Sequence, residues 1–498
     1  MARIAVIGAG LGAMAAAARL AVAGHRPVVF ERAATYGGAV GHIERDGFAF
    51  DTGPGLLLLP AVYRDLFVKT GKEPLEDLVG LTQVEPAVRH VFADGTRADL
   101  PNARRAGVAE ALDAAVGAGA GERWSAFMDR AREAWDRSRR PLLEEPLWPN
   151  WQVLADREPY PAPVRRRLLR KDRTARTLAE IGAFELGGEP RLVALLEQYA
   201  LAYGLDPRTA PASAAVLPYM EQTFGTWAVA GGLRALADAV YARCLRRKVE
   251  FRFGTAVTRI VVKDGRAAGV ELAGEAAEEA DFVVAGVAPG VLAGLLPGQA
   301  VRGEVPAWSE RAVPSRLTVH LALRGARPED TPHRTVVHGT DRDAELAWVF
   351  DGGPPPRRPT VAVLRAGEAA HVPDAGHEAV TVTVTVPPHA RVGAADVDAV
   401  LAQAAQALPG LRERLLWHEL RTPQDIAEAT GAQGGAVPAP ALAAAGGRLL
   451  HPANRTELPG LFAVGGWAHP GGGLPHAGMS GALVAGLIVE GPEFRGSQ

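Results

Sequence analysis

The stretch that decides the fold lies at the N-terminus and reads Arg3-Ile4-Ala5-Val6-Ile7-Gly8-Ala9-Gly10-Leu11-Gly12-Ala13. After Arg3, residues 4–7 are apolar and mostly β-branched, which predicts a short buried strand over residues 3–7. The glycines that follow fit the pattern G-x-G-x-x-G/A, with Ala13 in the last place. An alanine-rich helix is expected over residues 13–23 and a second strand over residues 27–30. This order predicts a βαβ unit that binds a dinucleotide.

Each residue of this loop has a physical role in such a site. Gly8 permits the tight turn from strand to helix, and Gly10 lets the backbone approach a pyrophosphate. The small Ala13 allows helix and strand to pack closely, and the helix N-terminus offers free N–H groups to the phosphates. Glu31, which follows Gly8 by 23 residues, is expected to accept hydrogen bonds from the ribose hydroxyls. Its negative charge disfavours a 2′-phosphate, so the nucleotide is not NADP.

Two further motifs follow the second strand. They are Glu31-Arg32 with Tyr36-Gly37-Gly38-Ala39, and the run GFAFDTGP over residues 47–54. Together they resemble the E-R-x(4)-G-G and D-x-G-x-x patterns of the large flavoprotein family that includes phytoene desaturases, amine oxidases and protoporphyrinogen oxidase. The resemblance implies that the double glycine passes beside the pyrophosphate of FAD. It also implies that the Asp-Thr-Gly turn lies near the flavin ring.

The C-terminal region carries a second glycine-rich signature, over residues 459–486. A strand is expected from Leu461 to Val464, then a glycine loop, then a helix that starts near Ala477. This region contains many glycines, and each of them costs backbone entropy on folding. Such a concentration of glycine is expected where the backbone must lie against a flat ligand. A helix N-terminus at this place would stabilise negative charge on the flavin pyrimidine.

The same region makes the resemblance more specific. His469-Pro470-Gly471, Gly473-Leu474-Pro475 and Ser480-Gly481 are similar to the C-terminal pattern of phytoene desaturases. The resemblance implies FAD as cofactor and hydride transfer between the flavin N5 atom and an apolar polyene, isoprenoid or related secondary metabolite, with desaturation as the leading reaction. The residues expected to bind FAD are Gly8, Gly10, Leu11, Gly12, Ala13, Glu31, Arg32, Gly37, Gly38, Ala39, Gly53, Pro54, Val257, Gly465, Gly466, Gly473, Leu474 and Met479.

The predicted fold class is α/β. It consists of a Rossmann-type FAD-binding domain of the amine-oxidase-like kind and an inserted α+β substrate domain, built on a mixed sheet with a helical lid. The FAD-binding domain is expected to comprise residues 1–75, 225–290 and 455–498. The substrate-binding domain is expected to comprise 76–224 and 291–454, with its helical part at about 105–220.

Three local features are expected in the substrate domain. Asp94-Gly95 predicts the turn of a hairpin over residues 82–99. Strands of a second sheet are expected at residues 315–325 and 378–387. The latter alternates at period two, which predicts one buried and one exposed face.

A weak base beside the flavin would help a desaturase lose the second hydrogen as a proton. The candidates are His469, His476 and Glu221, each of which also has a structural interpretation. His469 would then hydrogen-bond its loop, His476 would contact the helix start, and Glu221 would be a solvated helix residue. Trp227 and Tyr219 are expected to form walls of the substrate pocket.

Composition limits the remaining possibilities. The chain has 498 residues and a formal net charge of −2, which gives no general case for nucleic-acid binding. The single Cys244 excludes a disulfide framework and a cysteine-based zinc site, and it indicates a reducing, cytoplasmic location. The basic segment Arg165–Arg176 has two interpretations, a peripheral membrane contact and a solvated basic surface. Neither the substrate nor the oligomeric state follows from the sequence.

Three other activities remain open. One is a flavin oxidase of an amine or secondary metabolite, and another is a saturase or isomerase that uses reduced FAD. The third is a prenyl carrier of the same fold without a working flavin. Such carriers tend to lose the glycine fingerprint, which is present here.

Overall fold

A five-stranded parallel sheet forms the first body of the fold in the computed structural model, which describes residues 1–162, 174–296, 313–365 and 371–496. The predicted first strand is confirmed as β1 (Arg3–Ile7), and it lies in the middle of the sheet. The order across the sheet is β10 (Glu250–Arg252), β2 (Arg26–Phe30), β1, β14 (Phe282–Ala285) and β20 (Leu461–Ala463). Segments far apart in the sequence therefore build one sheet, as a Rossmann-type fold with an insertion requires.

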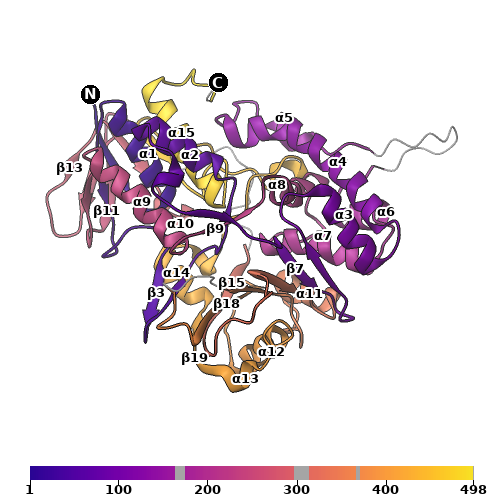
Figure 1. The fold of residues 1–498 in the computed structure, drawn as a ribbon. Helices are drawn as coiled ribbons and strands as arrows, with labels where there is room; N and C mark the ends of the chain where they lie inside the picture. The colour runs from indigo at the N-terminus through magenta and orange to yellow at the C-terminus, as the bar shows by residue number, and fades with distance from the viewer. Residues whose placement is uncertain (163–173, 297–312, 366–370, 497–498) are drawn as a thin grey trace, which may run out of the picture.

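Two helices pack on one another beside this sheet. The first, α1 (Leu11–Val22), starts directly after Gly10 and buries a run of alanines. The second, α15 (Leu474–Val489), comes from the other end of the chain and lies against α1 (Figure 1). The glycine loops that precede the two helices are thereby brought to the same end of the sheet.

Smaller elements complete this part of the molecule. They are the sheet β11 (Val257–Lys263), β12 (Arg266–Leu272) and β13 (Glu278–Glu279), the hairpin β3 (His42–Arg45) and β4 (Phe48–Asp51), and the sheet β5 (Leu57–Leu58), β9 (Thr226–Val229) and β6 (Leu81–Gln83). The accompanying helices are α2 (Ala61–Gly71), α9 (Gly232–Arg246) and α10 (Pro289–Gly294).

A seven-stranded mixed sheet forms the second body of the fold, in agreement with the predicted fold class. Its order is β19 (Leu415–Arg421), β15 (Ser315–Arg324), β18 (His377–Val386), β17 (Val361–Arg365), β16 (Arg334–Val337), β7 (Val88–Val91) and β8 (Arg97–Leu100). Only the β16–β7 pair within it is parallel. The helices that follow or cover its strands are α11 (Arg342–Asp351), α12 (Ala394–Ala404), α13 (Leu411–Arg414) and α14 (Pro423–Thr430).

The predicted helical region is confirmed over its described residues and lies to the right of the two sheets in Figure 1. It packs around its own buried core, in which Trp124, Phe127 and Leu196 are fully enclosed. Its elements are α3 (Arg105–Val116), α4 (Ala120–Arg139), a π-helical turn (Arg140–Glu144), α5 (Gln152–Asp156), α6 (Leu178–Phe184), α7 (Pro190–Ala202), a 3-10 turn (Ala212–Ala215) and α8 (Val216–Phe224).

Three local predictions need correction. Helix α15 begins at Leu474 and not near Ala477, because Pro475 occupies its first turn, where a missing N–H is tolerated. The hairpin at Asp94-Gly95 joins β7 to β8, whereas Leu81–Gln83 pairs with β9 in a separate sheet. Strand β18 has no exposed face, since its threonines are half-buried or buried and the Thr385 hydroxyl donates to Leu201 O.

Candidate cofactor and active site

The N-terminal glycine loop contains two glycines with different local requirements. Gly8 has φ +91°, a left-handed conformation that favours glycine, and its N–H donates to Phe30 O at 2.8 Å. Gly10 has φ −72° and ψ 164°, which any residue adopts. A Cβ built on Gly10 would meet no atom within 4 Å. The space in front of the N-terminus of α1 is therefore open, as a site for a phosphate requires.

Glu31 is held at the edge of this loop by the backbone. Its Oε2 accepts a hydrogen bond from Ala9 N at 2.7 Å, and its Oε1 accepts one from Ala33 N at 2.9 Å. Each carboxylate oxygen keeps further acceptor capacity. The carboxylate is thus fixed in position and can still receive a ribose hydroxyl.

The double glycine lies against the first glycine loop. Gly37 N donates to Ala9 O at 2.9 Å, and a Cβ on Gly38 would lie 3.1 Å from Gly10 Cα. Arg234 supports this segment from α9, since its Nη1 donates to Tyr36 O at 2.8 Å and its guanidinium lies over the Tyr36 ring. The segment around Gly37 and Gly38 therefore forms a second wall of the same opening.

The C-terminal glycine loop meets the N-terminal one. A Cβ on Gly12 would lie 2.9 Å from both Gly465 Cα and Ala477 O. Gly465 has φ +94°, and a Cβ on it would meet nothing within 4 Å. Its N–H donates to Ser480 Oγ at 2.9 Å, which ties the loop to α15. Backbone from both ends of the chain thus converges on one open space.

Asp51 fixes the turn that follows β4. Its carboxylate accepts hydrogen bonds from Leu233 N at 2.8 Å and Arg234 N at 3.1 Å, at the start of α9. A Cβ on Gly232 would lie 2.6 Å from Asp51 Oδ2, so only glycine fits there. Burial raises the pKa of Asp51, and the two backbone donors oppose that shift. The turn at Gly53 is therefore held in place by the first turn of α9.

His469 has a structural role in this arrangement. The side chain is fully buried, and its ring Nε2 lies 2.9 Å from Glu145 O, to which it donates. Burial lowers its pKa to about 4, so it is neutral at pH 7. His469 joins the C-terminal loop to the helical region, so its contact is structural but is made to Glu145 and not to its own loop as expected.

His476 differs from His469 in having a ring nitrogen without a partner. It lies in the first turn of α15 and is buried, and its Nδ1 has no hydrogen-bond partner among the described residues. A Cβ on Gly473 would lie 3.3 Å from this nitrogen. Burial lowers the pKa of His476 to about 3, with smaller effects of His451 and His469. A neutral ring with a free nitrogen thus lies at the C-terminal glycine loop.

Glu221 is not the solvated residue that its sequence context allowed. It is buried and forms an ion pair with Arg334, in which Nη1 lies 3.0 Å from Oε2. Tyr199 Oη lies 3.4 Å from its other oxygen. The carboxylate is already occupied by the guanidinium of Arg334, so the geometry favours a structural role.

The two predicted pocket walls are half-buried. Trp227 is in β9, where it pairs with Leu57 of β5, and its Nε1 donates to Phe224 O at 3.2 Å. Tyr219 lies on α8 and packs against Trp135 and Phe224. Their role in binding substrate stays a prediction.

The other predicted FAD contacts lie in varied surroundings. Arg32 points away from the glycine loops and donates to the carbonyls of Glu428 and Ala429 at the end of α14. Val257 begins β11, and Leu474 O accepts from Tyr63 Oη at 2.9 Å. The remaining members are in these loops or on their helices: Leu11, Ala13, Ala39, Pro54, Gly466, Gly473 and Met479. Of the basic segment Arg165–Arg176, residues 165–173 lie outside the described residues.

Asn454 was not identified from the sequence, and its side chain hydrogen-bonds the C-terminal glycine loop and the helix that follows it. Its Nδ2 lies 2.7 Å from His469 O and 3.0 Å from Ser480 Oγ, and the side chain is 1% exposed. A single asparagine in a loop of ordinary composition gives no pattern to detect. The roles of Asp51 and Arg234 were missed too, although the run at residues 47–54 that contains Asp51 was noted.

The comparisons with known proteins decide the family. The sequence profile of the flavin-containing amine oxidoreductases matches residues 14–489. The chain belongs to this family. This flavoprotein is 30% identical over 504 residues to the 4,4'-diapolycopene oxygenase of Methylomonas sp, with 98% of each chain covered. It is 29% identical over 510 residues to the hydroxyneurosporene desaturase of Rubrivivax gelatinosus, with 98% of this chain and 93% of the relative covered.

The fold is shared with solved members of the same structural class. An oxidoreductase from Methanosarcina mazei is similar with a TM-score of 0.65 at 16% identity, over 97% of this chain and 99% of the other. Family, fold and glycine loops agree with the predictions made from the sequence motifs. The flavoprotein is an FAD-dependent oxidoreductase of the phytoene-desaturase-like type.

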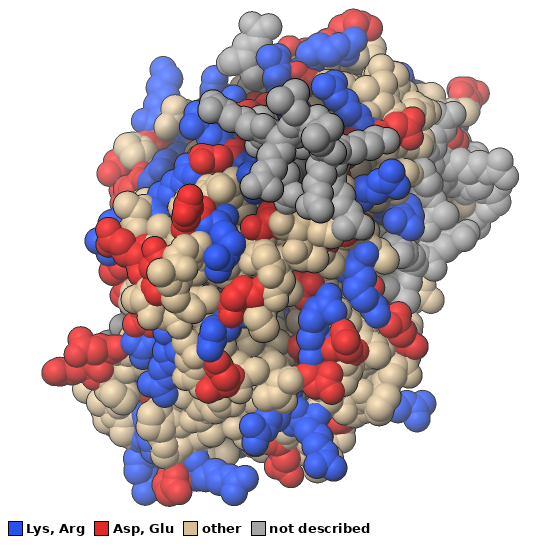
Figure 2. Space-filling model, turned by 90° about the vertical axis from the view of Figure 1, so that its right-hand side faces the viewer, with Lys and Arg blue, Asp and Glu red and all other residues tan. Residues whose placement is uncertain are grey.

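The distribution of surface charge and the apolar character of the helices are relevant to nucleic-acid and membrane binding. On the face shown in Figure 2, acidic and basic side chains are interspersed, and neither sign dominates the part that is coloured by charge. Among the described residues, no helix combines the length and the apolar character needed to cross a bilayer.

Proposed function

We propose that this enzyme desaturates a bulky apolar polyene of the carotenoid class. The observation that carries the proposal is the convergence of Gly10, Gly38 and Gly465 on one open space at the N-termini of α1 and α15. The likeness to a carotenoid-modifying oxygenase and desaturase over nearly the full chain supports the substrate class.

The protein's part in this reaction is binding and positioning. Glu31 would hold the ribose of FAD, and the N–H groups at Leu11 and Gly12 would hold the pyrophosphate. Asp51 fixes the turn at Gly53, and Ser480 fixes Gly465. When bound, FAD supplies the acceptor for the hydride that leaves the substrate carbon.

The proton from the neighbouring carbon needs a separate acceptor. The low pKa of His476 makes it a weak base at neutral pH, and Glu221 is committed to Arg334. We therefore assign His476 a positioning role, in which its free Nδ1 hydrogen-bonds a bound group at the C-terminal loop. Loss of the proton to solvent then completes the new double bond.

The test is product analysis under anaerobic conditions. FAD-loaded protein should lose its yellow colour when an acyclic polyene is added, and the polyene recovered should lack a pair of hydrogen atoms. An unchanged flavin spectrum with a panel of polyenes, together with bleaching by polar amines, would reject desaturation in favour of an amine oxidase.

Oxygenation of a polyene is the second candidate, because a relative at 30% identity is named an oxygenase. The same product analysis separates the two reactions. An added oxygen atom in the polyene, seen only when dioxygen is present, would favour the second candidate.

A further inference from the structure

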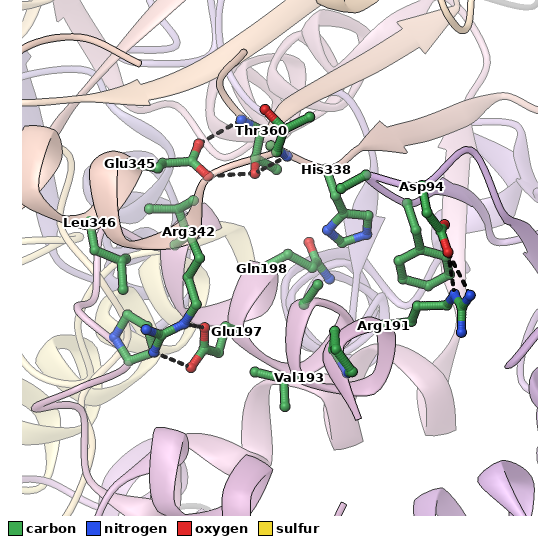
Figure 3. Close-up of a pocket in the computed structure, with 18 of the residues that line it drawn as sticks. Asp94, Arg191, Val193, Glu197, Gln198, His338, Arg342, Glu345, Leu346 and Thr360 are labelled. Atoms are coloured by element: carbon green, nitrogen blue, oxygen red, sulfur yellow. Dashed lines mark hydrogen bonds and ion pairs between the residues drawn. The ribbon is translucent and has the colours of Figure 1, made fainter. Parts of the chain in front are cut away.

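A cavity of about 670 Å³ lies between α7, α11, the β7–β8 turn and the segment 338–340 (Figure 3). This volume is in the range of sites that hold small ligands. Its rim is exposed at Asp94, Pro190 and Thr340, whereas its floor at His338 and Glu345 is buried. None of its lining residues belongs to the glycine loops of the cofactor site, so it is a separate feature of the molecule.

The charged groups around the cavity are already paired. Arg191 Nε lies 3.0 Å from Asp94 Oδ2, and Arg342 Nη2 lies 2.7 Å from Glu197 Oε1. Both pairs are drawn in Figure 3, on opposite sides of the cavity. Glu189 shares Arg191 with Asp94, and burial raises the pKa of Glu345 to about 7, which reduces its negative charge at neutral pH. With no unpaired arginine among the described residues of the lining and little free carboxylate charge, the cavity suits a neutral ligand.

Its polar floor offers hydrogen bonds to such a ligand. Gln198 and His338 point toward the middle of the cavity in Figure 3, and the side chain of Gln198 has no hydrogen-bond partner among the described residues. His338 Nε2 lies 2.9 Å from His90 Nδ1, and burial lowers the pKa of His338 to about 3, so the ring is neutral. The Glu345 carboxyl is held by Thr360, at 2.6 Å from its N–H and 2.7 Å from its hydroxyl.

The rest of the lining is apolar. Phe92, Val193, Leu201 and Leu346 form the walls around these polar groups. An apolar body with one neutral hydrogen-bonding group matches this combination, since burying the amide of Gln198 without a partner would be unfavourable.

We propose that the cavity binds a neutral isoprenoid that carries a hydroxyl or carbonyl group. The isoprenoid class rests on the proposed function, whereas the requirement for a polar group rests on the cavity itself. Such a group has two sources, the functionalised end of the enzyme's own polyene and a separate isoprenoid alcohol.

The first experiment is calorimetric titration of FAD-loaded protein with geraniol, a small isoprenoid alcohol, and with the hydrocarbon myrcene. Geraniol should bind wild type more tightly than myrcene. Gln198→Leu should weaken geraniol by about tenfold, the effect of one lost hydrogen bond, and leave myrcene unchanged. Ala194→Trp fills the cavity from α7 and should abolish binding of both. Ala202→Trp, on the exposed face at the end of the same helix, should bind as wild type does.

The second experiment separates the two sources. If the cavity receives an end of the substrate, geraniol should compete with a hydroxylated polyene, and Gln198→Leu should raise KM for that polyene but not for a hydrocarbon polyene. If the ligand is separate, geraniol binds without competition. Absence of geraniol binding, or equal binding by wild type and Ala194→Trp, would overturn the proposal. Flavin bleaching by a hydrocarbon polyene tests the proposed function independently, because that substrate has no polar group.

Discussion

Gly10 is a glycine for a reason that the protein alone does not explain. Gly8 needs its left-handed backbone, and Gly12 is pressed against Gly465 and Ala477. Gly10 has an ordinary φ of −72° and empty space where a side chain would be. The fold itself does not require glycine at position 10, whereas the cofactor motif does. Gly10 therefore marks the position of a ligand.

The substitution Gly10→Val should therefore separate folding from cofactor binding. We expect the thermal stability of the cofactor-free protein to stay near that of wild type, because a Cβ at this position meets no protein atom within 4 Å. Affinity for FAD should fall by roughly ten- to a hundredfold, because the side chain occupies the space of the pyrophosphate. Fluorescence titration of FAD, beside a melting curve of each cofactor-free protein, measures both. Unchanged FAD affinity in a stably folded variant would show that the phosphates bind elsewhere.

Single residues also mark the limit of what the sequence predicts. The glycines and Glu31 could be placed because their spacing along the chain is local. Glu221 could not, since its partner Arg334 is 113 positions away and only the folded chain brings them together. The unpaired Nδ1 of His476 likewise depends on how α15 packs against the rest of the fold.

Helices α1 and α15 are the elements that join the two halves of the site. They cross at Gly481, where a Cβ would lie 2.6 Å from Gly12 O and 2.8 Å from Ala15 Cβ. The close approach of the backbones places the glycine loops side by side. Packing at this crossing is therefore part of the cofactor site, although Gly481 itself faces a helix.

Replacing Gly481 with alanine should destabilise the protein by about 1–3 kcal/mol, the usual cost of overpacking. Its matched control is Gly290→Ala in α10, which is exposed and would meet no atom within 4 Å. The control should be neutral or more stable by up to about 1 kcal/mol, because alanine favours helix. Chemical denaturation of both variants measures the difference. Equal effects at the two positions would contradict the proposed close crossing.

At the level of elements, the sequence predicted whether a segment is a helix or a strand better than it predicted which other segments pack against it. Strands such as β1 and helices such as α1 follow from local pattern and were placed within a few residues. The exposed face predicted for β18 was wrong because its threonines are half-buried or buried, and Thr385 contacts α7, which lies far away in the sequence. The predicted start of α15 near Ala477 was wrong, because Pro475 lies in the first turn of the helix, where a missing N–H is tolerated.

On the scale of the whole molecule, histidines that stay neutral because of burial occur in several different parts of the fold. Burial is the main cause that lowers the pKa of six described histidines to about 3 or about 4, from an ordinary value of 6.5. These are His320, His333, His338, His451, His469 and His476. Two carboxyls, the half-buried Glu158 and the buried Glu345, have their pKa raised to about 7 and act in the opposite direction.

These groups predict sensitivity to acid. Between pH 7 and pH 5 the unfolded chain protonates its histidines while the native chain keeps these six neutral, so acid favours unfolding. The two carboxyls favour the native state over the same range but are outnumbered. The free energy of unfolding should fall by more than about 2 kcal/mol from pH 7 to pH 5. Urea unfolding at several pH values measures it, and a constant or rising stability on acidification would contradict the assigned burial.

The central claim is that both ends of the chain form one FAD site. Hydrogen–deuterium exchange of the protein with and without FAD tests it most directly. The account predicts that FAD slows exchange at residues 8–13, 37–38 and 465–479 together. Slowing confined to one end of the chain, or absent from all three segments when FAD is bound, would contradict it.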